Sequence, residues 1–342
     1  MFSKNVWTRR SPGTGEETNM EFLTGLTPEE TLELEELLDA SSIGTEVRVR
    51  GAVHTIRDMG ELSFVVLRKR DGLLQCIFEE GMTNYAVKDL REEMAVEISG
   101  VLEEDARAPH GIEIRAREVK VFGRPYEAPP LPIGKWKLNT SLEAKLNYRS
   151  TALRNVRERA KFRIQEGIVR GFRDFLYSQH FTEIHTPKIG SKGAEGGSNV
   201  FKLDYFHRPA VLAQSPQFYK QMMVGVFERV FETAPVFRAE KHNTKRHLNE
   251  YTSLDFEMGY ISGFEDIMKM ETGFLQYTMK LLSEEYAEEL RILGVTLPKT
   301  EQIPMVRFDR AKELVAEQYN RKIRNPYDLE PEEESLIGQY FK

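Results

Sequence analysis

A polar, basic segment between two strand-like arms is the part of the sequence best suited to phosphate chemistry. The first arm ends at Phe237-Arg238, and a loop with several cations follows it: Lys241, His242, Lys245, Arg246 and His247. A guanidinium fixed at the end of a strand can bind a phosphate through two hydrogen bonds, and a flexible basic loop can close over a polyphosphate. The segment therefore predicts a phosphate site, although an ordinary charged hairpin would have the same composition.

The order of residues in this segment resembles motif 2 of the class II aminoacyl-tRNA synthetases. The form is that of the aspartyl-tRNA synthetases of the archaeal and eukaryotic type. The resemblance rests on Phe237-Arg-Ala-Glu240, on Arg246-His247 and on Leu254-Asp-Phe-Glu257. It implies that Arg238 binds the α-phosphate of ATP and stabilises the charge that accumulates there during in-line displacement. It also implies that Glu240 positions the adenine side of ATP, and that Arg246 or His247 holds the distal phosphates.

Three upstream segments strengthen the resemblance. The stretch that ends Phe181-Thr-Glu-Ile-His-Thr-Pro-Lys188 is similar to motif 1, with Pro187 in the place of the motif's proline, which implies a homodimer interface there. Gly193-Ala-Glu-Gly-Gly-Ser198 and Gln214-Ser-Pro-Gln-Phe-Tyr-Lys220 resemble the family's substrate-facing loops. The linked motifs occur in the family's order, so chance is a poor explanation.

The resemblance also implies a pocket for L-aspartate. Lys220 is expected to pair with the side-chain carboxylate of the substrate, a charge-assisted contact in a desolvated site. The acceptors expected around the substrate's ammonium group are Glu195, Gln217 and Asp255. The family uses no protein base in the first step, because the substrate carboxylate is already a nucleophile.

The N-terminal third of the chain reads as a small β-barrel. Short β-rich runs separated by turn residues begin at Val47, Leu62, Leu73, Ala95 and Ile112, and Asp71-Gly72 is a strong hairpin signal. A helical segment is expected at residues 82–91, between the third and fourth runs. Five strands with one intervening helix are typical of an OB-fold.

Alternation along these strands predicts which side chains face outward. Gln75 lies between Leu74 and Cys76, and Glu113 lies between two isoleucines, so both should point away from the barrel core. In the resembled family a phenylalanine, a glutamine and a glutamate on this outer surface contact the anticodon, and Phe64, Gln75 and Glu113 fit those places. An aromatic ring can stack on an unpaired base while the amide and carboxylate read base edges. Ala52 departs from the pattern, since related sequences often carry an aromatic residue there.

The expected fold class is therefore α+β, with the OB-fold barrel followed by a class II catalytic domain built on an antiparallel sheet. A proline-rich stretch after Gly123 reads as a linker, an amphipathic helix is expected at residues 157–179, and one strand is expected to follow it at residues 182–189. The expected parts are a disordered extension, an anticodon-binding barrel, a hinge and an incomplete catalytic domain, at residues 1–19, 20–123, 124–156 and 157–342. The true start codon could be Met1 or Met20.

Composition fits a cytoplasmic enzyme of this kind. The net charge is −6, 40% of residues are hydrophobic, and the sequence has no apolar run of the length that a membrane span needs. The single cysteine, Cys76, excludes an internal disulfide and a multi-cysteine metal site, and favours a reducing compartment.

The C-terminal sixty residues depart from the family. Class II enzymes carry a third motif, a glycine-rich strand and helix with an arginine on ATP, together with acidic Mg²⁺ ligands, and nothing from Ser283 to Lys342 matches these. We therefore expect Mg²⁺ to accompany ATP through ligands beyond residue 342, and expect this chain alone to be inactive. The open alternatives are an asparaginyl- or lysyl-tRNA synthetase and an inactive tRNA-binding paralogue. Charging of tRNA(Asn) beside tRNA(Asp) also stays open.

Overall fold

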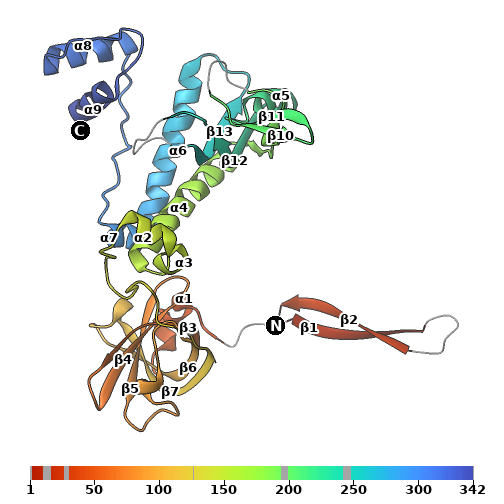
Figure 1. Cartoon of the computed structure of the whole chain (residues 1–342), viewed down its shortest axis with the longest axis vertical. Helices are drawn as coiled ribbons and strands as arrows, with labels where there is room; N and C mark the ends of the chain where they lie inside the picture. The colour runs from red at the N-terminus through yellow and green to blue at the C-terminus, as the bar shows by residue number, and fades with distance from the viewer. Residues whose placement is uncertain are drawn as a thin grey trace. The chain divides into compact units, whose positions relative to one another are not determined.

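The computed structural model describes residues 2–10, 17–26, 31–125, 127–193, 199–241 and 248–341. They belong to two compact units, Met1–Arg159 and Ala160–Lys342, and most of their elements are labelled in Figure 1. The strands of the first unit are β1 (Phe2–Arg10), β2 (Glu17–Leu26), β3 (Glu46–Asp58), β4 (Leu62–Arg68), β5 (Leu73–Glu79), β6 (Ala95–Glu104) and β7 (Ile112–Gly123). Its helices are α1 (Leu34–Leu37), α2 (Leu142–Asn147) and α3 (Arg149–Ala152).

Five of these strands form a closed barrel in the order β3, β4, β5, β7 and β6. Strands β5 and β7 are parallel, and the other neighbours are antiparallel. Alternate residues of the strands enter one core, interrupted by register shifts where β3 pairs with β4 and where β6 pairs with β7. In this core Val49, Leu67, Leu74, Ile98 and Ile114 are fully buried. The barrel predicted from the alternating strands is confirmed.

The helix expected at residues 82–91 is wrong, because the described segment has only a short 3-10 helix at Val87–Asp89. The reason lies in the Asn84 side chain. Its Oδ1 accepts a hydrogen bond from the Val119 N–H at 2.7 Å, and its Nδ2 donates to the Val119 carbonyl at 3.3 Å. An asparagine that satisfies distant backbone groups holds its own backbone out of a helix.

The disordered extension expected at residues 1–19 also differs from the structure, which has an antiparallel hairpin of β1 and β2. The β-branched and aromatic residues in Val6-Trp7-Thr8 and in Phe22-Leu23-Thr24 favour extended backbone.

The expected linker is packed into the first unit. Asn155 is fully buried, and its side-chain Nδ2 donates to the carbonyls of Ile133, at 2.9 Å, and Lys135, at 2.6 Å. Its Oδ1 accepts from the backbone N–H of Arg157 at 3.1 Å, at the start of helix α4 (Val156–Ser178). One asparagine thus caps a helix and fixes the proline-rich segment.

In its described residues, the second unit continues from α4 into two small sheets and five more helices. Its strands are β8 (Thr182–Glu183), β9 (Ile189–Gly190), β10 (Lys202–Tyr205), β11 (Arg208–Leu212), β12 (Arg229–Phe237) and β13 (Glu250–Met258). Its helices are α5 (Gln217–Phe227), α6 (Phe264–Glu285), α7 (Ala287–Leu293), α8 (Phe308–Tyr319) and α9 (Pro331–Tyr340). Among the described residues no helix has the length and apolar character needed to cross a membrane.

The long helices α4 and α6 lie side by side next to β12 and β13 (Figure 1). Two glycines of α4 permit the close approach, because a Cβ on Gly167 would lie 2.6 Å from Leu282 and one on Gly171 would lie 2.5 Å from Thr278. Phe172 of α4 packs edge-to-face against Phe231 and Phe274, with ring centroids 5.7 and 5.2 Å away. This contact ties both helices to one face of the sheet and leaves the other face for α5.

Candidate active site and nucleic-acid interface

The strand pair β12–β13 presents a row of polar side chains on the face opposite α4. Glu232 lies directly across from Asp255, and Ala234 from Ser253, so these residues share one face of the sheet. Phe231 and Thr233 alternate with them and point to the α4 side. The two predicted arms of the phosphate-binding segment are therefore these two strands.

Lys220 of α5 reaches this face. Its Nζ lies 3.1 Å from Asp255 Oδ1 and 3.5 Å from Glu257 Oε2. The side chains of Lys220 and Asp255 are only 13% and 15% exposed, and the Ser253 hydroxyl donates a short hydrogen bond to Asp255. Ion pairs shielded from water in this way are stronger than surface pairs and fix the positions of both partners.

Gln217 is the first residue of α5 and precedes Lys220 by three positions, which places both on one side of the helix. The helix begins here because the Lys220 N–H donates to the Pro216 carbonyl at 2.8 Å and the Gln217 N–H donates to the Ser215 hydroxyl at 3.2 Å. Two of the predicted aspartate-pocket residues, Lys220 and Asp255, are in direct contact, and Gln217 lies one turn away from Lys220.

Arg238 and Glu240 directly follow β12. Their backbones are held by Asn249, whose side-chain Nδ2 donates to the carbonyl of Arg238 at 2.8 Å and to that of Glu240 at 3.0 Å. The Arg238 N–H in turn donates to the Asn249 carbonyl at 2.9 Å. The two arms are thus closed at the base of the loop, and the Arg238 backbone is held directly after the strand. Glu195, Arg246 and His247 lie outside the described residues.

Sequence reasoning missed Glu232 and Glu257. Glu257 follows Asp255 by two positions on the same strand, so the two-residue period of a strand was sufficient to predict that both side chains lie on one face of the sheet. Glu232 is 3% exposed and binds the segment around Pro187. Its Oε1 accepts from the Thr186 N–H at 2.6 Å, and its Oε2 lies 2.7 Å from Lys188 Nζ. Nothing in the one-dimensional sequence links these positions, which are more than forty residues apart.

Pro187 itself is exposed and lies at the edge of a hollow of about 460 Å³. The single strand expected at residues 182–189 is wrong, because its two ends belong to different sheets as β8 and β9. Pro187 supplies no N–H, and the Thr186 N–H is used by Glu232, so neither residue can extend a strand ladder here.

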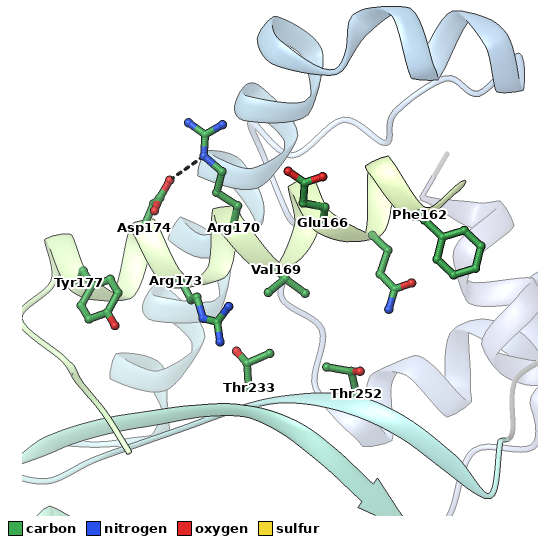
Figure 2. Close-up of a pocket in the computed structure, with 10 residues that line it drawn as sticks. Phe162, Glu166, Val169, Arg170, Arg173, Asp174, Tyr177, Thr233 and Thr252 are labelled. Carbon is green, nitrogen blue, oxygen red and sulfur yellow. Dashed lines mark hydrogen bonds and ion pairs between the residues drawn. The ribbon is translucent and has the colours of Figure 1, made fainter. Parts of the chain in front are cut away.

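A second hollow, of about 540 Å³, lies between α4 and the other face of β12 and β13. Figure 2 shows Arg173 of α4 and Thr233 of β12 pointing toward one another across it, with Arg170 and Asp174 on the far side of the helix. Burial raises the pKa of Glu183, but hydrogen bonds from Tyr177 and Arg173 outweigh burial and hold the pKa below its usual value. This hollow is separated by the sheet from Lys220 and Asp255.

The barrel carries the predicted nucleic-acid residues on its outer face. Phe64 is half-buried and lies outside the core cluster, whereas its neighbours Ser63 and Val65 are buried. Gln75 and Glu113 are register partners on β5 and β7, and Gln75 Nε2 donates to Glu113 Oε2 at 2.8 Å. Their predicted outward direction is confirmed by burial of Leu74, Cys76, Ile112 and Ile114 in the core.

Glu113 is nevertheless only 4% exposed, and its carboxylate is bound by the Gln75 side chain. On the neighbouring position of β7, Arg115 binds Glu103 at 2.9 Å and also contacts Glu79. The hydrogen bond from Arg115 lowers the pKa of Glu103. Burial raises the pKa of the Cys76 thiol, which leaves it a core residue.

A metal site is not formed by the described residues, where no cluster of three or more His, Cys, Asp or Glu side chains converges. The donor set around Lys220 consists of two carboxylates already paired with a cation. These residues therefore do not fit a resident divalent ion, and none of them acts as a metal ligand in the proposed reaction.

Two family models match the chain. Residues 47–122 match the OB-fold nucleic acid binding domain, and residues 141–339 match the class II tRNA synthetases of the D, K and N group. Among solved structures, the asparaginyl-tRNA synthetase from Pyrococcus horikoshii complexed with asparaginyl-adenylate superposes with a TM-score of 0.81 at 26% identity. That similarity covers 91% of this chain and 72% of the other. The aspartyl tRNA synthetase from Entamoeba histolytica has a TM-score of 0.75 at 26% identity, over 91% and 68%.

Curated relatives are more similar in sequence. The aspartate–tRNA(Asp/Asn) ligase of Deinococcus radiodurans is 44% identical over 87% of this chain and 67% of its own length. The ligase of the same name from Thermus thermophilus is 42% identical over 88% and 69%, and the aspartate–tRNA(Asp) ligase of Pyrococcus furiosus is 36% identical over 87% and 69%. The chain thus spans about two thirds of the length of these proteins, and it belongs to the aspartyl-tRNA synthetase family of class II tRNA synthetases, with an N-terminal OB-fold domain.

Proposed function

We propose that this chain acts as an aspartate–tRNA ligase, which activates L-aspartate with ATP and transfers the aspartyl group to tRNA(Asp). The single observation that carries the proposal is the shielded pair of Lys220 and Asp255 on the β13 face. A zwitterionic amino acid with a second carboxylate needs one fixed cation and at least one fixed anion. Lys220 offers the cation, and Asp255 and Glu257 offer the anions.

The same pair disfavours the alternatives. Asparagine has a neutral side-chain amide, which would form no charge-assisted contact with the Lys220 ammonium, whereas the side-chain carboxylate of aspartate would form one. Lysine would bring a second ammonium toward Lys220, and like charges at short range are repulsive. The similarity to the Pyrococcus horikoshii asparaginyl-tRNA synthetase supports the shared fold and motif arrangement rather than the amide substrate.

In the proposed reaction, a carboxylate oxygen of L-aspartate attacks the α-phosphorus of ATP, and pyrophosphate leaves with the electron pair of the broken P–O bond. Arg238 stabilises the negative charge that develops on the α-phosphate, and its backbone is held at the end of β12 by Asn249. Glu240 lies within the same anchored turn and is proposed to face the adenine. Arg246, His247 and Glu195 keep their proposed roles at the distal phosphates and the substrate ammonium.

The proposal extends to a homodimer contact, to Mg²⁺, to a second acceptor tRNA and to the cellular location. The exposed Pro187 and the hollow beside it support a homodimer contact at that segment. Mg²⁺ is proposed to arrive with ATP, bound to its phosphates. Because the Deinococcus and Thermus relatives are named for both acceptors, tRNA(Asn) is proposed as a second acceptor. A cytoplasmic location fits the single, buried cysteine.

Calorimetric titration tests the substrate assignment. The chain is titrated with L-aspartate, L-asparagine and L-lysine, and with a non-hydrolysable aspartyl-adenylate analogue. We expect the analogue and L-aspartate to bind, and Lys220→Met to weaken both by a factor of ten or more, because one charge-assisted contact contributes about 1.5–3 kcal/mol. Lys269→Met, which removes a lysine with a side chain 77% exposed on α6, is the matched control. Equal affinities of Lys220→Met and wild type would remove Lys220 from the site.

A further inference from the structure

The outer wall of the barrel has a second polar surface, on β3, β6 and β7. The inward residues there are Val49, Ile98 and Val119, which are at most 4% exposed. The residues that alternate with them face outward, and Arg50, Glu97 and Lys120 lie side by side across the three strands. Phe64 lies on β4, and Gln75 and Glu113 lie on β5 and the first half of β7, so this surface uses a different part of the barrel wall.

An exposed phenylalanine is the centre of this surface. Phe122, the next outward residue of β7 after Lys120, is 51% exposed. The Arg50 guanidinium lies 5.6 Å from the centroid of its ring, and Lys120 Nζ lies 5.3 Å from it. Two cation–π contacts hold the ring in place and surround it with positive charge, although the ring itself stays accessible to solvent.

Around the Phe122 ring the outward charge of this surface is positive, while two exposed acidic residues, Glu46 and Glu118, lie at its far end beside Arg48. Glu97 is bound by Arg50 at 2.8 Å and by Arg48 at 4.0 Å, but its side chain is only 11% exposed. The side chains of Arg48 and Arg50 are 44% and 52% exposed. The carboxylate thus lies beneath the two guanidinium groups, where it orients them, and the cations form the layer that a partner would meet.

A flat accessible ring among cations fits one kind of partner, an unpaired nucleotide. Bases stack on aromatic rings regardless of sequence, and the adjacent phosphates pair with arginine and lysine. The OB-fold nucleic acid binding model covers residues 47–122, which includes all four residues of this surface. We propose that Arg48, Arg50, Lys120 and Phe122, the Phe122 surface, form a second RNA-contact site of the barrel, which binds a base and phosphates of the same tRNA whose anticodon contacts Phe64. This inference rests on the proposed tRNA ligase function.

The test uses the full 342-residue chain and a tRNA(Asp) transcript, with affinity measured over a range of salt concentrations. Phe122→Ala should weaken binding roughly 5- to 150-fold, which is the range for loss of one stacked base. Phe122→Leu keeps an apolar side chain but loses the flat ring, and should weaken binding similarly while the circular dichroism spectrum stays unchanged. Lys120→Gln should reduce the slope of log K against log salt by about 0.7–0.9, the value for one phosphate contact.

Phe206→Ala is the control, because Phe206 is 80% exposed but lies in the second unit. If Phe122→Leu and Lys120→Gln bind the transcript like wild type while Phe64→Ala binds weakly, the Phe122 surface is no RNA site and the tRNA ligase proposal stands. If Phe122→Leu changes only sedimentation, from self-associated to monomeric, the surface binds a second copy and the RNA assignment is overturned. A wild-type chain that fails to bind the transcript would overturn both proposals.

Discussion

Glu232 and Asp255 lie directly opposite one another on β12 and β13, yet they bind lysines from two different segments of the chain. Glu232 holds Lys188, beside Pro187, at 2.7 Å, and Asp255 holds Lys220 of α5 at 3.1 Å. Two adjacent carboxylates would repel one another if they were unpaired, and the two lysines remove this repulsion. The proposed dimer segment and the proposed aspartate pocket are therefore fastened to neighbouring positions of the same strand pair.

The first prediction concerns the stability of this arrangement. Glu232→Gln leaves Lys188 without its counter-charge in a largely buried position, and should lower the free energy of unfolding of the second unit by about 3 kcal/mol. Glu288→Gln breaks the exposed pair of Glu288 and Arg291 on α7, whose side chains are 45% and 68% exposed, and should cost less than about 1 kcal/mol. Urea denaturation followed by fluorescence measures both. The double variant Glu232→Gln/Lys188→Met should recover part of the loss, and equal effects of Glu232→Gln and Glu288→Gln would contradict this interpretation.

A second prediction concerns Arg238. Arg238→Ala removes the guanidinium that directly follows β12 and, in a catalytically complete enzyme of this family, should reduce aspartate-dependent ATP–pyrophosphate exchange by about 10²-fold or more, the scale of one preorganised transition-state contact. Binding of L-aspartate alone should change little, because the lost contact is to the α-phosphate. Arg291→Ala, on the exposed surface of α7, is the control. An exchange rate near that of wild type would take Arg238 out of the mechanism.

The third prediction is a pH dependence that originates at His54 of β3. The residue is 2% exposed, and Nδ1 has no hydrogen-bond partner among the described residues. Burial, with a further contribution from the positive charge of Arg68, lowers the pKa of His54 from 6.5 to about 4. The folded barrel therefore keeps this ring neutral, while the unfolded chain takes up a proton below about pH 6.5. Stability is unaffected above that pH and falls as the pH decreases from about 6.5 to about 4.

The loss from this one group should be on the order of 2–3 kcal/mol over that window. His54→Gln removes the titrating ring, so its melting temperature should depend less on pH between 6.5 and 4 than that of wild type. Differential scanning calorimetry at several pH values gives the slope of melting temperature against pH for wild type and for His54→Gln. These two slopes are compared, and not the absolute stabilities. Parallel slopes would show that other groups cause the acid sensitivity.

The parts of this fold that sequence predicted are those set by local periodicity. Alternation placed Leu74 and Cys76 inside the barrel and Gln75 outside, because a period of two depends only on neighbours along one strand. The two arms around the basic loop were recognisable for the same reason. Lys220 and Asp255, in contrast, were brought together by resemblance to a family, and their contact at 3.1 Å depends on how α5 packs against β13.

Three of the misses share one physical cause, which is a polar side chain that satisfies a distant backbone or charged group. Asn84 bonds to Val119 across the barrel, which replaced the expected helix by a short turn. Asn155 bonds to Ile133 and Lys135, which made an expected hinge into a packed segment. Glu232 bonds to Thr186, which divided an expected strand. Each partner is more than fifteen residues away, and hydrogen bonds of this kind leave no periodic signal in a single sequence.

The last prediction separates binding from folding on the outer face of the barrel. Phe64 is half-buried and outside the core cluster, whereas Phe78 on the adjacent strand is 1% exposed and belongs to that cluster. Phe64→Ala should therefore cost only about 1–1.5 kcal/mol of folding stability, roughly half the value of a fully buried phenylalanine. Phe78→Ala opens a cavity in the core and should cost about 3–5 kcal/mol.

Affinity for the anticodon, unlike folding stability, should be more sensitive to Phe64→Ala than to Phe78→Ala. If Phe64 stacks on an anticodon base, Phe64→Ala should weaken binding of the tRNA(Asp) transcript by about 1–3 kcal/mol, while its melting transition stays cooperative. The effect should persist at high salt, because stacking releases no counterions, whereas the contribution of phosphate contacts declines. Fluorescence titration and thermal melting on the same samples give both quantities. If Phe64→Ala melts like Phe78→Ala, Phe64 is a core residue. If Phe64→Ala binds RNA like wild type, Phe64 takes no part in recognition beside Gln75 and Glu113.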